Sequence, residues 1–235
     1  MIGDVLMRED LWEQTWVSPA VPSGKWQDAS YVLLAEIHDD EFIKNCNSQL
    51  IDQLSTPNSI LLVEGMRSLW RPLSFEKTAA ALLSLRISEV AMQKIPTVMG
   101  WDYFNHLGDQ AFYCSFDPPY TIFVGDDERD RPKFREYARV IRSDGPMDLE
   151  RGMASLLAWG ENMATFPKRT DAMVQTLRVV EQRKALDPSI GKVFLVAGKS
   201  HVINSSSVGW ESLGPLYAEL NRLPAAVISI GHPRH

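Results

Sequence analysis

The chain has 235 residues, of which 45% are hydrophobic and 23% charged, and its net charge is −6. This length and composition predict one globular domain with a sizeable core. The acidic balance argues against a nucleic-acid-binding protein, and two cysteines argue against a disulfide framework or a cysteine zinc cluster.

The start of the chain shows no secretory signal, because no cationic region precedes an apolar core. No apolar stretch approaches the roughly 20 residues that a bilayer-crossing helix requires. We therefore expect a cytoplasmic protein without a transmembrane segment, with secretion as an effector as the alternative. Residues 1–30 are rich in tryptophan and proline and predict an N-terminal extension that lies over a single domain formed by residues 31–235.

Strand-like and helix-like segments alternate along this domain. Helical periodicity fills the intervals between apolar runs; Asp39 or Asp40 is the expected cap of the first helix, and Thr170 the expected cap of a helix separate from the one after Gly145-Pro146. This alternation predicts an α/β fold with a mostly parallel or mixed central sheet flanked by helices. The expected strands cover about 31–37, 59–64, 96–101, 120–125, 193–198 and 225–230.

Two of these strands share one plan, in which an apolar run reaches a small residue and then a histidine. The first runs through Ala35 to His38, and the second runs through Ala197 and Gly198 to His201. A histidine in this position lies at the carboxyl end of a strand, where ligands and catalytic groups collect in open α/β sheets. The two histidines are therefore the first candidates for function.

Acidic residues accompany the histidines. Glu36 and His38 are two positions apart, so they share one face of an extended strand, and Glu64 ends the second domain strand. Glu36, His38, Glu64 and His201 would gather at one edge of a parallel sheet, where imidazoles and carboxylates suit Zn, Mn, Co or Fe. Such a metal lowers the pKa of its bound water; without a metal, the same groups act as general acid and base.

Three further residues are weaker or different candidates. Asp102 ends the third domain strand and also suits the cap of the next turn, and His106 follows it in an expected loop. Arg151 shares a helix face with small residues, so a ligand carboxylate or an oxyanion has room to approach its guanidinium. The alternative for Arg151 is an ion pair with neighbouring surface acids. Its small neighbours are Ala154, Ser155 and Ala158.

These motifs, taken in order, resemble the superfamily of Tiki/TraB proteins, ChaN-like haem-binding proteins and erythromycin esterases. The resemblance rests on Ala35–Asp39, Leu62–Met66, Leu149–Ala154 and Gly198–His201, and Ala35 stands where the family usually has glycine. It implies a split βαβ fold with the site between two pseudo-repeats. It also implies a set of site residues, namely Glu36, His38, Glu64, Arg151 and His201.

The hypothesis that follows is a hydrolase of amide or ester bonds, metal-assisted, that acts on a small molecule or a peptide. His38 and His201 would hold the ion or serve as base, Glu36 and Glu64 would ligate or orient, and Arg151 would stabilise the oxyanion. One alternative is a haem- or iron-binding protein of the ChaN-like type, and another is a non-catalytic toxin or effector module on the same fold. The candidate haem ligands are Tyr103, Tyr113 and Tyr120.

Overall fold

The computed structural model describes residues 12–36, 40–68, 70–103, 149–202 and 214–232. Six strands form one sheet in the order β1-β6-β2-β5-β3-β4. All neighbouring pairs run parallel except β1, which is antiparallel to β6. The strands are β1 (Trp12–Val17), β2 (Tyr31–Glu36), β3 (Ile60–Arg67), β4 (Thr97–Asp102), β5 (Val193–Gly198) and β6 (Ala225–Ile230).

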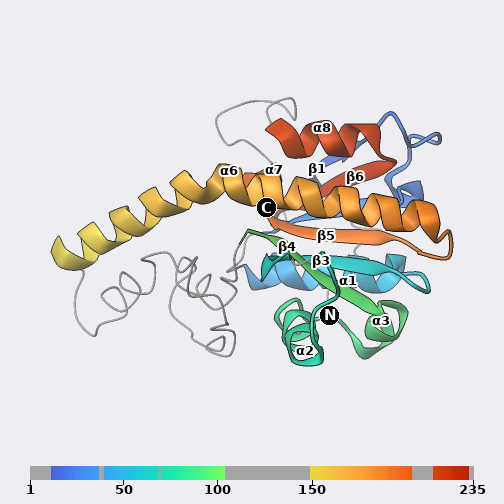
Figure 1. Ribbon diagram of the computed structural model, residues 1–235, viewed down its shortest axis with the longest axis horizontal. Coiled ribbons are helices and arrows are strands. Elements are labelled where there is room, and N and C mark those ends of the chain that lie inside the picture. The colour runs from blue at the N-terminus through green and yellow to red at the C-terminus, as the bar shows by residue number, and fades with distance from the viewer. Residues whose placement is uncertain (1–11, 37–39, 69, 104–148, 203–213, 233–235) are drawn as a thin grey trace.

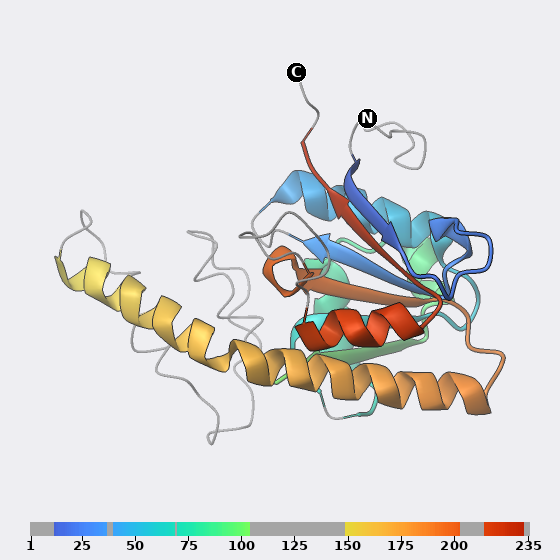
Figure 2. The ribbon, with the colours of Figure 1, turned by 90° about the horizontal axis from the view of Figure 1, so that it is seen from above.

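Helices cover both faces of the sheet, and this arrangement confirms the predicted α/β fold with a mostly parallel sheet (Figures 1 and 2). The helices α1, α2 and α3 lie on one face, and α6 and α8 lie on the other. Each face has its own apolar core, because successive strand residues such as Leu33 and Leu34 point to opposite sides. The helical segments are η3 (Trp26–Asp28), α1 (Glu41–Leu54), α2 (Phe75–Ser84), α3 (Glu89–Lys94), α6 (Leu149–Leu186), α7 (Lys199–Val202) and α8 (Gly214–Arg222).

The central strands β2, β5 and β6 are buried along their whole length. Their almost continuous apolar sequences are what a strand covered by helices on both faces requires. Five of the six predicted strands are present within a few residues of their expected bounds, and the segment predicted at 120–125 lies outside the described residues. Within the described residues, no helix has the length and apolarity needed to cross a bilayer.

The tryptophan-rich N-terminal segment differs from its prediction. Its residues 12–17 do not lie over the domain but extend the sheet, with Trp16 paired to Val227 of β6. The Trp16 ring packs against Tyr217 of α8, with ring centroids 5.3 Å apart. Tryptophan, threonine and valine all favour strands, so this segment carried a local signal for the edge strand that it forms.

The long helix α6 also differs from its prediction. Thr170 does not cap a separate helix, since one continuous helix of 38 residues includes both Pro167 and Thr170. Both ribbon views show α6 changing direction near its middle, with its N-terminal part extending beyond the sheet (Figures 1 and 2). A proline removes one backbone hydrogen bond and is the usual cause of such a bend. Packing of Met173, Leu177 and Val180 into the core stabilises the second half of the helix.

Three polar residues of α6 contact the β3–β4 side of the molecule at intervals of seven residues. Arg169 bonds Glu64 and Asp102, and Thr176 and Ser68 share a hydrogen bond through their hydroxyls. Arg183 donates to the carbonyl of Trp70. Seven residues make about two helical turns, so all three side chains lie on one line along the helix. This line sets which part of α6 faces the carboxyl ends of β3 and β4.

The connection between β2 and α1 ends in a helix cap. Asp40 accepts from the backbone N–H groups of Phe42 and Ile43 at 3.0 and 3.1 Å, which places the expected cap at Asp40. Its second oxygen lies 2.6 Å from His232 Nε2, and the His232 ring stacks on Phe42. His232, two residues after the end of β6, is thereby attached to the start of α1.

Candidate active site

The candidate site begins at an irregularity in β3. The pairing of β3 with β4 is regular as far as Val63, and then residues 64–66 of β3 lie opposite Trp101 alone. Gly65 has a φ of 77°, a left-handed conformation that glycine adopts without strain. A bulge of this kind redirects the side chains beside it. Because of this bulge, Glu64 lies outside the regular pairing of β3 with β4, at the carboxyl edge of the sheet.

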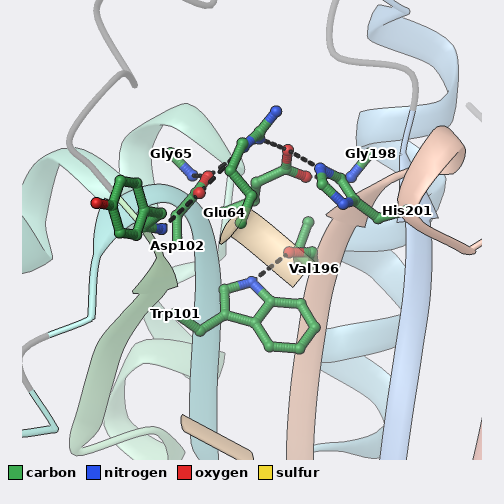
Figure 3. Close-up of polar contacts among 9 residues, drawn as sticks. Glu64, Gly65, Trp101, Asp102, Val196, Gly198 and His201 are labelled. Carbon is green, nitrogen blue, oxygen red and sulfur yellow. Dashed lines mark hydrogen bonds and ion pairs between the residues drawn. The ribbon is translucent and has the colours of Figure 1, made fainter. Parts of the chain in front are cut away.

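The Glu64 carboxylate is held from three directions (Figure 3). Its Oε1 accepts from Arg169 Nη2 of α6, and its Oε2 accepts from the backbone N–H of Gly198 at the end of β5. Its Oε1 also lies 3.3 Å from His201 Nε2 of α7. The side chains of Glu64 and His201 are only 3% and 1% exposed, so these contacts are made away from bulk water.

Asp102, at the end of β4, holds the other side of Arg169. Its two oxygens accept from Arg169 Nε and Nη2, both at 3.0 Å, in a bidentate arrangement. The same oxygens accept from the backbone N–H groups of Gly65 at 3.0 Å and Tyr103 at 2.7 Å. The Asp102 side chain is fully buried. Asp102 therefore connects the guanidinium to the backbone of β3 and β4.

Trp101 supports this cluster from below. The pairing of β3 with β5 ends at Val63 and Val196, where β3 bulges away. The indole N–H of Trp101 donates to the carbonyl of Val196 at 3.1 Å, across the end of β3 (Figure 3). The Trp101 side chain is fully buried and lies below Glu64 (Figure 3).

The electrostatics of the cluster depend on Arg169. Burial opposes the charge of its guanidinium, but the negative charges of Asp102 and Glu64 outweigh this effect and raise the pKa of Arg169 above its ordinary value. The guanidinium thus stays charged and balances one of the two carboxylates. With both carboxylates ionised, the three side chains carry a net charge of −1.

The structure brings some of the predicted residues together. Glu64 and His201 are in contact, and Asp102, a weaker candidate by sequence, belongs to the same cluster. Glu36 is buried at the same edge, where its Cα pairs with that of Gly198. Glu36, Gly198 and Glu64 thus lie on three adjacent strands.

Other predicted residues are placed elsewhere or are not described. Arg151 lies in the first turn of α6, eighteen residues before Arg169. At roughly 1.5 Å per residue, this separation is about 27 Å along the helix, and the structure describes only the backbone there. Tyr103 lies beside the cluster, with Lys168 Nζ 5.6 Å from the centre of its ring. Four candidates lie outside the described residues, namely His38, His106, Tyr113 and Tyr120.

Sequence reasoning missed Arg169. Its neighbours Pro167, Lys168 and Thr170 are typical of an exposed helix start, and several other charged residues follow along α6. The one sequence feature that points to Arg169 is its seven-residue spacing from Thr176 and Arg183. This spacing indicates a line of polar side chains on one face of the helix. That line has no meaning until α6 is known to cover β3 and β4.

The predicted metal ligands include His38, which lies outside the described residues. Within the described part of the chain, no three His, Cys, Asp or Glu side chains gather in a way that could hold a metal ion. Both oxygens of Glu64 accept hydrogen bonds from protein donors, and Arg169 neutralises much of its charge. These contacts do not fit Glu64 as a metal ligand while both donors stay in place.

Comparison of the chain with protein-family models, with curated proteins and with solved structures finds no match. The superfamily resemblance therefore stays a prediction, and the argument for function depends on the chemistry of the cluster.

Proposed function

We propose that this protein is a hydrolase of ester or amide bonds in which His201 is the general base and Glu64 orients it. The observation that carries the proposal is the 3.3 Å approach of His201 Nε2 to Glu64 Oε1 at the carboxyl edge of a parallel sheet. A carboxylate beside an imidazole stabilises the imidazolium that forms when the base takes a proton. Contacts of this length commonly shorten when substrate binds.

The proposed reaction uses the two ring nitrogens differently. The carboxylate of Glu64 favours the proton on Nε2, so Nδ1 is the nitrogen left to take a proton from water. Nδ1 is buried in this structure, so the proposed reaction requires water and substrate to reach it. The water oxygen then forms a bond to the substrate carbonyl carbon, and the carbonyl π electrons move to its oxygen. When the tetrahedral intermediate collapses, the C–O or C–N bond breaks and the leaving group takes the proton from Nδ1. The oxyanion role of Arg151 stays a prediction.

The test is hydrolysis of a panel of p-nitrophenyl esters and amino-acid p-nitroanilides by the full chain. The substitution His201→Gln should lower kcat/KM by about 10²- to 10⁴-fold, which is the usual contribution of a general base. His232→Gln is the matched control, because this exposed histidine pairs with Asp40 and lies outside the cluster. Equal rates in wild type and His201→Gln would overturn the proposal. A folded wild type that cleaves no member of the panel would favour the non-catalytic module instead.

The metal-assisted form of the same hydrolase is tested by metal analysis. Stoichiometric Zn, Mn, Co or Fe in the wild type, lost from His38→Ala together with activity, would support it. Hydrolysis that survives in metal-free protein would support His201 acting without a metal. The haem alternative also stays a prediction, and a Soret shift on addition of haemin is the observation that would favour it.

A further inference from the structure

The cluster contains two residues that the proposed reaction does not use directly. Asp102 and Arg169 are buried, charged and connected to each other, yet only Glu64 and His201 have roles in the proposed proton transfer. Buried ion pairs cost desolvation energy and are weak evidence of stabilisation by themselves. A role in holding the reacting groups would give both residues a function at this edge.

The contacts of Asp102 indicate that it holds other groups and does not react. A carboxylate offers about four acceptor positions, and protein donors take four hydrogen bonds here. Two come from the backbone of Gly65 and Tyr103, and two come from the guanidinium of Arg169. The backbone donors belong to the end of the sheet. Asp102 thereby fixes the plane of the Arg169 guanidinium relative to β3 and β4.

Arg169 transmits this fixed orientation to Glu64. Its Nη2 donates to Asp102 Oδ2 and to Glu64 Oε1, so one nitrogen bridges the two carboxylates. The bond from Gly198 N–H holds the other oxygen of Glu64. Without Arg169, the contacts described above would hold Glu64 only through the Gly198 N–H and His201 Nε2. The carboxylate would then be able to rotate away from His201.

We propose that Asp102 and Arg169 are positioning residues, which fix the Glu64 carboxylate and through it the His201 ring. This inference rests on the proposed function and assigns the residues that make its geometry possible. Positioning errors of about 1 Å reduce rates by about 10²-fold. We therefore expect loss of Arg169 to reduce kcat by about 100-fold, with KM within twofold of wild type.

The decisive experiment is chemical rescue of Arg169→Ala with guanidinium ion. This variant leaves a space between two buried carboxylates that a free guanidinium ion fits in size and charge. Millimolar guanidinium chloride should restore kcat at least tenfold, and sodium chloride at equal ionic strength should not. Arg178→Ala is the matched control, because Arg178 lies on the same helix but pairs with Glu219. This control should keep wild-type kcat and show no response to guanidinium.

Three outcomes would overturn the positioning role. They are wild-type kcat in Arg169→Ala, equal recovery of that variant with guanidinium and sodium, and an equal increase in the kcat of Arg178→Ala on addition of guanidinium. If Arg169→Ala does not fold, Asp102→Asn/Arg169→Met removes one charge of each sign and keeps Glu64 with His201. Its kcat should fall with KM unchanged, and wild-type kcat in this double variant would overturn the inference.

Failure of the proposed function gives a different result. A wild type that cleaves no substrate overturns hydrolysis, and the thermal unfolding of Arg169→Ala then tests the geometry alone. A rise in Tm with guanidinium but not with sodium supports a guanidinium site between Glu64 and Asp102. Equal Tm values in the two salts overturn that site.

Discussion

Helix α6 carries two arginine–carboxylate clusters that have similar chemistry and different surroundings. In the first, Arg169 contacts Glu64 and Asp102, with side-chain exposures of 6%, 3% and 0%. In the second, Arg178 contacts Glu219, and their side chains are 49% and 9% exposed, so only the arginine reaches solvent freely. Arg222 extends the second cluster by joining Glu219 to Glu181. The first cluster connects α6 to the carboxyl ends of β3 and β4, and the second connects α6 to α8.

The difference in solvent exposure between the two clusters indicates a different role for each. Solvent reaches the two arginines of the second cluster and screens their charges, so this cluster serves mainly to join two helices. The first cluster is closed to solvent, and every ion in it depends on the others for compensation. Such a cluster holds a fixed geometry beside His201. The predictions below test this contrast.

The largest expected effect is that of Arg169→Met on stability. Removing the cation leaves Glu64 and Asp102 buried without compensation, which costs about 3–5 kcal/mol in the free energy of unfolding. Urea unfolding of the purified chain measures this loss. The matched variant Arg178→Met should have a urea midpoint close to that of wild type. Equal losses in the two variants would show that burial does not separate the clusters.

A smaller effect is expected from coupling within the buried cluster. Asp102→Asn/Arg169→Met should be more stable than the sum of the two single losses implies, by about 1–3 kcal/mol. The reason is that the double variant removes one buried charge of each sign. A double-mutant cycle of urea unfolding measures this coupling free energy. Additive losses would contradict direct dependence between the two residues.

In the second cluster, whose arginines are exposed to solvent, Glu219→Gln should lower the free energy of unfolding by about 1 kcal/mol, the upper end of the range for screened ion pairs. High salt should reduce the difference from wild type, because ions in solution screen these charges. Thermal unfolding with and without added sodium chloride checks both statements. A loss as large as that of Arg169→Met would remove the contrast.

The smallest effect is a pH dependence. The hydrogen bond from Arg178, opposed by burial and assisted by Arg222, holds the pKa of Glu219 below its ordinary value of 4.5. A lowered folded-state pKa gives stability that is complete above pH 4.5 and is lost as the pH falls through the folded value. As the pH falls below 4.5, the Tm of the wild type should therefore decrease more than the Tm of Glu219→Gln. Parallel curves for the two proteins would contradict the assignment.

The sequence allowed much of the sheet to be predicted, because strands covered on both faces have nearly continuous apolar sequences. Tyr31–Glu36 and Val193–Gly198 show this signal clearly. The edge strand Trp12–Val17 was not predicted, since its tryptophans favoured a segment packed over the domain. Pro167 similarly suggested an interruption of α6, whereas core packing of the later residues keeps the helix continuous.

The site was predicted in part. Glu64 and His201 were found because strand ends are recognisable, and parallel strands bring their ends to one edge. Asp102 was ranked low because a carboxylate after a strand is also typical of a turn. Arg169 was not found, since its importance comes from the crossing of α6 over β3 and β4, which no local pattern encodes. Whether Glu36 and His38 act with this cluster stays a prediction.

The seven-residue line of Arg169, Thr176 and Arg183 has a consequence for how this gene can change. One residue inserted between Arg169 and Thr176 would rotate the two side chains relative to each other by about 100°. The cluster and the contacts to Ser68 and Trp70 could then not form together. Substitutions along α6 can accumulate one at a time, but its length between these positions is fixed. Within α6, the spacing of these contacts is preserved only by insertions before Arg169 or after Arg183.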